Sequence, residues 1–144
     1  MTDSNAPAKV ARKVLLTGAT GFLGHHVAHA LISRGYEVVA LCRDPEAPAA
    51  RRLPKTVVRL QGDILDADAV GSAALGCQAV IHCAGKVSRD PEDALELTRV
   101  NHDGMRVVFE ACKKAGVGRA VLASTSGTIA ISDDPDHVGN EEDE

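Results

Sequence analysis

Short apolar runs alternate with amphipathic segments along most of the chain. Residues 13–17 are a β-branched and aliphatic run ending at a glycine, which predicts a strand buried on both faces of a parallel sheet. Apolar side chains then recur at helical spacing from Phe22 to Leu31, and Gly35 is suited to end that helix. The first unit is therefore a strand, a tight turn and a helix.

The same alternation continues to residue 123. Further strands are expected at 37–42, 56–60, 79–83 and 120–123, and helices at 67–75, with Asp66 as N-cap, and at 93–115. The Pro- and Ala-rich stretch 43–54 interrupts the pattern. Such spacing predicts parallel βαβ units with right-handed crossovers. The expected fold is α/β, an incomplete Rossmann-type doubly wound parallel sheet of about five strands in the order 3-2-1-4-5.

The two ends of the chain lack this pattern. Residues 1–11 are polar and contain Pro7, which is typical of a flexible N-terminus, and the acidic residues 133–144 are expected to be loop or disorder. Residues 12–132 are therefore expected to form one domain. With 44% hydrophobic residues but only 2% aromatic ones, its core must consist mainly of Val, Leu, Ile and Ala.

Charge and hydropathy narrow the choice of partners. Seven of the 20 acidic residues lie within 133–144, so residues 1–132 carry 16 basic and 13 acidic groups, a net charge of +3. Because this small excess forms no basic cluster, a nucleic-acid partner is not expected. No run approaches the roughly 18 apolar residues that cross a membrane, and the polar N-terminus has no signal-peptide pattern, so we expect a cytoplasmic protein without a membrane partner.

Cysteine and histidine spacings do not predict a metal site. The four cysteines form no C-x-x-C pair, which favours reduced, small apolar side chains. His25 and His29 would share a helix face, but no third ligand accompanies them at a fixed spacing. We expect helix histidines that face solvent or a partner.

The turn after the first strand carries the strongest motif. Residues 17–24 read Thr-Gly-Ala-Thr-Gly-Phe-Leu-Gly, a Gly-x-x-Gly-x-x-Gly pattern between a strand and a helix. In that context Gly18 permits the sharp turn, Gly21 lets the backbone approach a pyrophosphate, and Gly24 lets the helix pack closely. Dinucleotide binding is the favoured interpretation, and a turn that serves packing alone is the alternative.

The chain resembles the extended or atypical short-chain dehydrogenases/reductases, which are the NAD(P)-dependent epimerases, dehydratases and dihydroflavonol-reductase-like enzymes. Five motifs carry the resemblance, and they follow one another in the order found in that family. The motifs are residues 17–24, 62–64, 82–85, 100–104 and 124–126. The resemblance implies hydride transfer between a nicotinamide cofactor and a small-molecule carbonyl or alcohol substrate, or a nucleotide sugar. The Arg-Asp-Pro sequence at 43–45 favours a reductase.

The resemblance also implies where the cofactor lies. Its contacts are expected at Gly18, Thr20, Gly21, Phe22, Leu23, Gly24, Arg43, Asp63, Ile64, Cys83, Ala84, Gly85 and Lys86. Asp63 would accept a hydrogen bond from the adenine amino group, with Ile64 against the ring, unless Asp63 is simply a turn or capping residue. Cys83 is expected to be a small buried side chain, because no base for a thiolate is evident.

The choice between NADP and NAD depends on Arg43. A guanidinium at the end of the second strand suits a 2′-phosphate, which an acidic residue would repel. NADP is therefore preferred. NAD remains the alternative cofactor, because the acidic Asp44 follows directly. A solvated arginine is the alternative interpretation of Arg43.

Candidate catalytic residues follow from the same resemblance. Ser126, with Thr125 as second choice, would hydrogen-bond the substrate oxygen, and Asn101 would organise backbone and water near the active site. An ordinary polar turn is the alternative for the serine and threonine. For Asn101 the alternative is an ordinary helix residue without a role in the active site. The family's Tyr-x-x-x-Lys pair is missing, because Tyr36 is the only tyrosine and no lysine follows Lys114.

This absence leads to the expectation that the chain is the N-terminal portion of a longer NAD(P)-dependent enzyme, inactive by itself, and compatible with a homodimer. A non-catalytic dinucleotide-binding or sensor module is the alternative. A weaker third interpretation is an inert fragment whose exposed sheet edge pairs with another chain.

Overall fold

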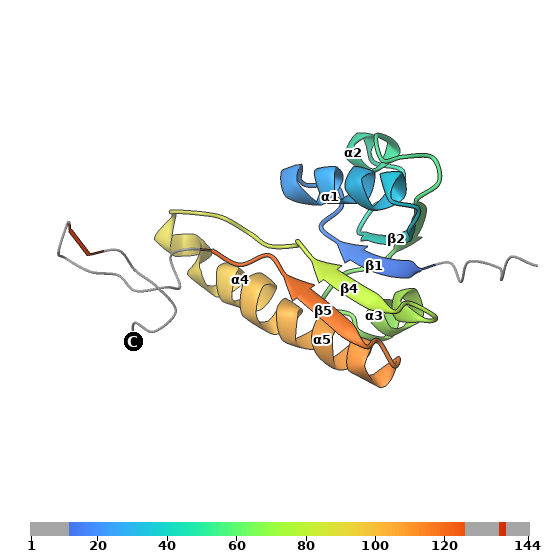
Figure 1. Cartoon of the computed structure of the whole chain (residues 1–144). Helices are drawn as coiled ribbons and strands as arrows, with labels where there is room; N and C mark the ends of the chain where they lie inside the picture. The colour runs from blue at the N-terminus through green and yellow to red at the C-terminus, as the bar shows by residue number, and fades with distance from the viewer. Residues whose placement is uncertain (1–11, 126–135, 138–144) are drawn as a thin grey trace, which may run out of the picture.

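Five parallel strands form one sheet in the order β3-β2-β1-β4-β5, which confirms the predicted fold class and strand order. The computed structural model describes residues 12–125 and 136–137. The strands are β1 (Lys13–Thr17), β2 (Glu37–Cys42), β3 (Val58–Gln61), β4 (Ala79–His82) and β5 (Arg119–Leu122). Because each neighbouring pair is parallel, the carboxyl ends of all the strands meet at one edge of the sheet (Figure 1).

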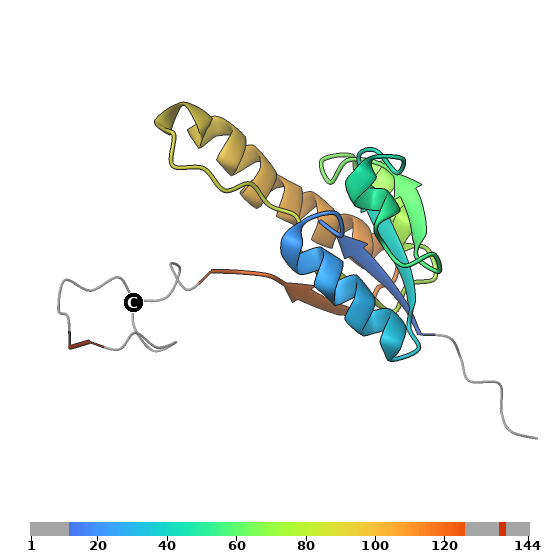
Figure 2. The same cartoon turned by 90° about the horizontal axis from the view of Figure 1, so that it is seen from above.

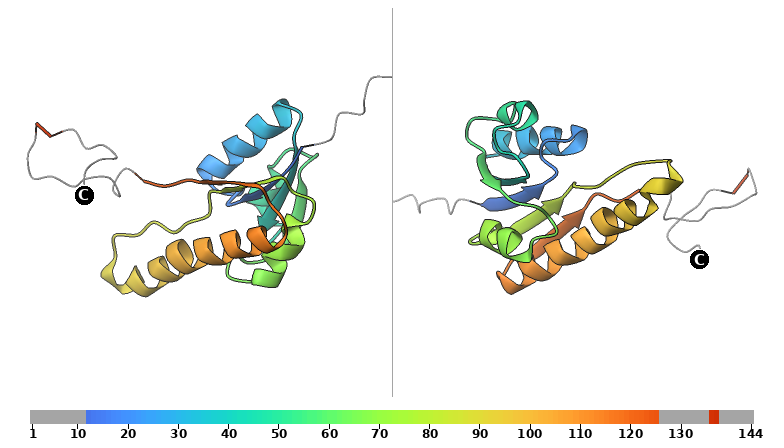
Figure 3. Two further views of the ribbon diagram at one scale, coloured as in Figure 1. Left: turned by 60° about the horizontal axis from the view of Figure 1, so that its bottom comes forward. Right: turned by 180° about the vertical axis from the view of Figure 1, so that it is seen from behind.

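Helices cover both faces of the sheet. They are α1 (Phe22–Ser33), α2 (Pro48–Arg51), α3 (Ala67–Ala74), α4 (Ala94–Thr98) and α5 (Gly104–Lys114), with a π-helical turn, Arg99–Asp103, joining α4 to α5. Figure 3 shows α1 on one side of the sheet and α3 and α5 on the other. In Figure 2, α4 extends beyond the carboxyl ends of the strands.

Alternate strand residues point into two separate cores. Leu15 and Val80 belong to the core that α3 and α5 cover, whereas Leu16, Val38 and Ala40 belong to the core beneath α1 and α2. This alternation follows from the two-residue repeat of a strand, and both sets are apolar because both faces are covered. The buried cores contain aliphatic side chains and cysteines, as the composition predicts.

Local signals in the sequence set most element ends. Asp66 caps α3 as predicted, accepting hydrogen bonds at 3.0 Å from the backbone N–H groups of Asp68 and Ala69. Gly35 follows α1 with φ of 77°, and Gly76 follows α3 with φ of 72°. Both conformations favour glycine because it lacks a Cβ atom.

Three differences from the expected elements go beyond a shift of one residue at an element end. The stretch 43–54 contains a short helix, α2, which begins at Pro48, a residue suited to the first helical position. The third strand spans 58–61 rather than 56–60, because the N–H of Val57 closes a turn onto the carbonyl of Pro54. The helix expected at 93–115 contains the π-helical turn, which periodicity alone does not reveal.

The edge strands differ from the central ones in exposure. Every residue of β3 and of β5 is exposed, and Val121 in β5 is 55% exposed. No helix among the described residues is long and apolar enough to cross a bilayer.

Candidate functional site

A cleft of about 700 Å³ opens at the carboxyl edge of the sheet. Its lining includes Thr20 and Gly21, which directly precede α1, and Glu96 of α4; Figure 1 shows these two helices on either side of the strands. Most residues expected to contact a cofactor line this cleft: Gly18, Thr20, Gly21, Arg43, Asp63, Ile64, Cys83, Ala84, Gly85 and Lys86. The other three, Phe22, Leu23 and Gly24, form the first turn of α1 directly beside it. Tertiary structure therefore brings together residues that are 68 positions apart in the chain, from Gly18 to Lys86.

The glycine-rich turn after β1, residues 18–21, is held in close backbone contact. Gly18 has φ of 70°, and a Cβ atom there would lie 2.5 Å from the backbone nitrogen of Ala84. A Cβ atom on Gly24 would lie 2.1 Å from the carbonyl oxygen of Gly18. Gly21 differs, since its Cβ position has one neighbour, the Gly18 oxygen at 3.4 Å. Gly18 and Gly24 are therefore required for packing, whereas Gly21 leaves space on the cleft side.

The N-terminus of α1 is suited to an anion. Its N-cap residue, Gly21, has no side chain to accept from the first-turn N–H groups, and the first turn contains no acidic residue. By contrast, the N-terminus of α3 is capped by the Asp66 carboxylate. Uncapped N–H groups and the helix dipole both favour a bound phosphate, so the backbone of α1 fits the pyrophosphate of a dinucleotide.

Arg43 and Asp63 lie on the side of the cleft formed by β2 and β3. Arg43 directly follows β2, is exposed, and makes no hydrogen bond or ion pair with any other residue that the structure describes. Its guanidinium is therefore available to a ligand. One oxygen of Asp63 accepts a hydrogen bond of 2.9 Å from the backbone N–H of Leu65, so Asp63 also has the turn role considered as its alternative.

Asn101 clamps the loop that follows β4. Its Oδ1 accepts from the backbone N–H of Lys86 at 2.8 Å, and its Nδ2 donates to the carbonyl of Lys86 at 2.9 Å. Asn101 lies in the π-helical turn, a distortion that is frequent at functional sites. The asparagine therefore has a positional role, which helix propensity would not explain.

Lys86 also makes an ion-pair network at the mouth of the cleft. Its Nζ lies 2.8 Å from Asp93 Oδ1 and 2.8 Å from Glu96 Oε2. Hydrogen bonds to Asp93 and Glu96 raise the pKa of Lys86, and the lysine in turn lowers the pKa of Asp93. Its ammonium is thus engaged by carboxylates, which sequence reasoning missed.

Glu96 and Arg99 line the cleft but were not singled out from the sequence. Both precede Asn101 on adjoining helical turns, and their proximity to the 100–104 motif is the signal that could have indicated them. Cys83 is half-buried, and burial raises the pKa of its thiol. That shift favours the neutral thiol, in keeping with the interpretation of Cys83 as a packing residue.

The candidate substrate-binding residues are only partly described. Thr125 follows β5 and is exposed, while Ser126, the first choice, lies outside the described residues. Tyr36 directly precedes β2, at the edge of the sheet opposite the cleft. The single tyrosine therefore lies far from the place where a proton donor would act.

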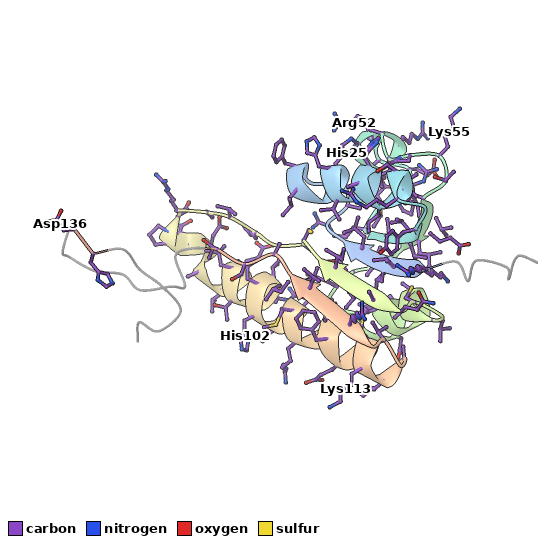
Figure 4. All side chains as sticks on the ribbon, viewed as in Figure 1. His25, Arg52, Lys55, His102, Lys113 and Asp136 are labelled. Carbon is purple, nitrogen blue, oxygen red and sulfur yellow. The ribbon has the colours of Figure 1, made fainter. Side chains whose placement is uncertain are left out.

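The histidines of α1 lie beside this cleft: His25 and His26 line a neighbouring hollow together with Thr20 and Gly21, which also line the cleft. The rings of His25 and His29 have centroids 4.7 Å apart, and burial followed by the neighbouring His29 lowers the pKa of His25. His25 and Arg52 lie on the same side of the molecule in Figure 4. Within residues 12–125 and 136–137, no three or more His, Cys, Asp or Glu side chains gather as a metal site would require.

Comparisons with known proteins agree with this geometry. The family model described as "NAD dependent epimerase/dehydratase family" matches residues 14–144. Dihydroflavonol 4-reductase of Solanum lycopersicum is 34% identical over an alignment of 145 positions that covers 93% of this chain and 38% of that protein. Cinnamoyl-CoA reductase 1 of Oryza sativa subsp. japonica is 35% identical over an alignment of 136 positions that covers 89% of this chain and 39% of that protein.

Solved structures show the same arrangement. The UDP-glucose 4-epimerase of Thermus thermophilus in complex with NAD superposes with a TM-score of 0.76 at 33% identity, covering 90% of this chain and 42% of that one. MoeE5 in complex with UDP-glucose and NAD gives a TM-score of 0.72 at 30% identity, covering 89% of this chain and 42% of that one. The chain thus spans about two fifths of the length of these relatives.

Proposed function

The chain belongs to the NAD-dependent epimerase/dehydratase family, and from that premise we propose that it forms the NAD(P)-binding part of a reductase acting on a small carbonyl or alcohol substrate. One observation carries the proposal. The uncapped N-terminus of α1, the tightly packed Gly18 and the open Gly21 together form a backbone cradle at the carboxyl edge of a parallel sheet. That edge is where open α/β sheets bind their ligands.

Each side of the cleft has a proposed role toward a dinucleotide. The N–H groups at the start of α1 would hold the pyrophosphate, and Asp63 with Ile64 would bind the adenine. The loop 83–86, clamped by Asn101, would lie against the ribose and nicotinamide. The bound cofactor would supply the hydride, while Thr125 or Ser126 would orient the substrate oxygen.

We propose NADP rather than NAD as the preferred cofactor. The free guanidinium of Arg43 at the end of β2 supports this, because charge-assisted hydrogen bonds would favour the doubly charged 2′-phosphate. The two plant reductases among the relatives support the reductase assignment over an epimerase. The two solved neighbours are complexes with NAD, so the affinities of this chain for NADPH and NADH must be compared directly.

Binding by the chain provides the direct test. The chain contains no tryptophan, so calorimetry or the fluorescence of the reduced nicotinamide is the suitable readout. NADPH should bind more tightly than NADH. Gly21→Val should abolish binding while the fold survives, because its side chain would occupy the space on the cleft side of the turn. Retained affinity in a folded Gly21→Val variant would refute the phosphate-cradle proposal.

A non-catalytic dinucleotide-binding or sensor module is the second candidate, because the cleft by itself accounts for dinucleotide binding and not for a reaction. Both candidates predict that the 144-residue chain binds NADPH without turnover. Rapid NADPH-dependent reduction of an aldehyde or ketone by the chain alone would contradict both. A whole protein that binds NADPH but reduces no carbonyl compound would favour the sensor.

A further inference from the structure

Two polar side chains are buried directly beneath the cleft. Thr17, the last residue of β1, is 0% exposed, and His82, the last residue of β4, is 1% exposed. They are opposite each other in the parallel register of β1 and β4. Thr17 Oγ1 and His82 Nδ1 lie 2.6 Å apart in a hydrogen bond. Within the part of the chain that the structure describes, these two are the buried polar residues.

Core packing alone does not account for this pair. Leu15 and Val80, two residues earlier in the same strands, fill the same face of the sheet with aliphatic side chains. His82 continues that face, with its ring edge-on to Phe109 of α5 at a centroid distance of 5.9 Å. Two aliphatic residues could occupy this last layer, whereas burying a histidine and a threonine is costly unless they bond each other. We therefore look for a role of the Thr17–His82 pair other than filling the core.

Thr17 and His82 directly precede the two loops that line the cleft. Thr17 precedes Gly18 of the glycine-rich turn, and His82 precedes Cys83 and Ala84. The backbone N–H of Cys83 donates to the carbonyl of Thr17 at 3.1 Å. A Cβ atom on Gly18 would approach the Ala84 nitrogen to 2.5 Å. Both loops line the cleft. Their backbones are therefore in contact directly after the Thr17–His82 hydrogen bond that links β1 to β4.

We propose that the Thr17–His82 hydrogen bond is a positioning device that fixes the spacing between the glycine-rich turn and the loop after β4. A hydrogen bond is directional and has a narrow range of lengths, whereas aliphatic contacts tolerate sliding. The bond thereby keeps the backbone of Gly18 against that of Ala84 and fixes how the two loops line the cleft. The inference rests on the proposed function, because the cleft is the site assigned there to the dinucleotide.

Matched substitutions test the pair. Thr17→Val keeps the side-chain shape but removes the hydroxyl, and His82→Leu removes the ring nitrogen. Each should raise the Kd for NADPH about tenfold, because the two loops that line the cleft would no longer be held at one spacing before the cofactor binds. Thr17→Ser and His82→Asn retain a polar atom at the hydrogen-bonding position and should stay within about threefold of the wild type.

A control separates positioning from stability. Val70 in α3 is fully buried in the same core and does not line the cleft, so Val70→Ala should destabilise the fold without changing the Kd. Backbone hydrogen exchange in the absence of cofactor gives a second readout. Thr17→Val should speed exchange at Gly21 and Lys86, whose N–H groups donate to Gly18 and Asn101, and Val70→Ala should not do so selectively.

The outcomes are distinguishable. A Thr17→Val variant with wild-type Kd and wild-type exchange at the two loops would overturn the inference, as would a Val70→Ala variant that loses affinity equally at equal stability. A wild-type chain that binds neither NADPH nor NADH would overturn the proposed function instead. The exchange rates at Gly21 and Lys86 would still decide whether the pair holds the two loops.

Discussion

Replacing Gly24 by alanine gives the sharpest test of how the glycine-rich turn is packed. Gly24 lies in the first turn of α1, where a methyl group would stand 2.1 Å from the carbonyl oxygen of Gly18 and 2.6 Å from its carbonyl carbon. Ordinary contact begins at 3.4 Å, so the turn and helix would have to separate by about 1.3 Å. Both contacted atoms belong to the backbone, so no rotamer change relieves the clash.

The expected magnitude combines two opposing effects. Overpacking costs about 1–3 kcal/mol, and the clash with backbone places Gly24→Ala near the upper end. Replacing glycine by alanine inside a helix returns about 1 kcal/mol. The free energy of unfolding should therefore fall by about 2 kcal/mol. Affinity for NADPH should fall as well, because the N–H of Gly21 donates to the displaced Gly18 oxygen at 3.0 Å.

Gly71 provides the matched control. It lies inside α3, and a Cβ atom there would meet nothing within 4 Å. Gly71→Ala should therefore raise the free energy of unfolding by about 0.5–1 kcal/mol and leave NADPH binding unchanged. Urea unfolding followed by far-ultraviolet circular dichroism measures both variants, since the chain has no tryptophan. Equal stabilisation by the two substitutions would refute the packing argument.

Three further predictions concern the cleft and its support. Arg43→Glu should reverse the order of NADPH and NADH affinities in calorimetric titrations, because the carboxylate would repel a 2′-phosphate; equal affinities before and after the change would show that Arg43 has no part in selection. Asn101→Asp should weaken NADPH binding about tenfold, because it replaces the donor to the Lys86 carbonyl by an acceptor; unchanged affinity would mean that the clamp is dispensable. Burial lowers the pKa of His82 below its ordinary value of 6.5. As the pH falls below about 6.5, His82 is therefore protonated in the unfolded chain before it is protonated in the folded one. Stability should therefore decline on acidification, and His82→Asn should reduce that decline in urea titrations between about pH 7.5 and about pH 5; the same pH dependence in both proteins would contradict the assignment to His82.

Much of the fold was predictable because its signals are local. Apolar runs bounded by glycine predict the strands, Asp66 and Gly76 mark the ends of α3, and the βαβ spacing implies the strand order. The short helix α2 was missed because a four-residue helix has too few positions to show periodicity. The π-helical turn at Asn101 was missed because it adds one residue to a helical pattern that otherwise continues.

By itself, the sequence determined the order of the five strands, the aliphatic core and the glycine-rich turn, since each depends on residue types at short spacing. Tertiary structure alone decided which distant residues meet. Asn101 reaches the backbone of Lys86, and Thr17 reaches His82 across 65 positions, because parallel strands return the chain to the same sheet edge. Spacing along the chain carries no record of the Thr17–His82 contact, since two strands and three helices lie between the partners. The cleft is therefore a property of the assembled sheet, whereas the glycine-rich turn that lines it could be predicted from eight residues.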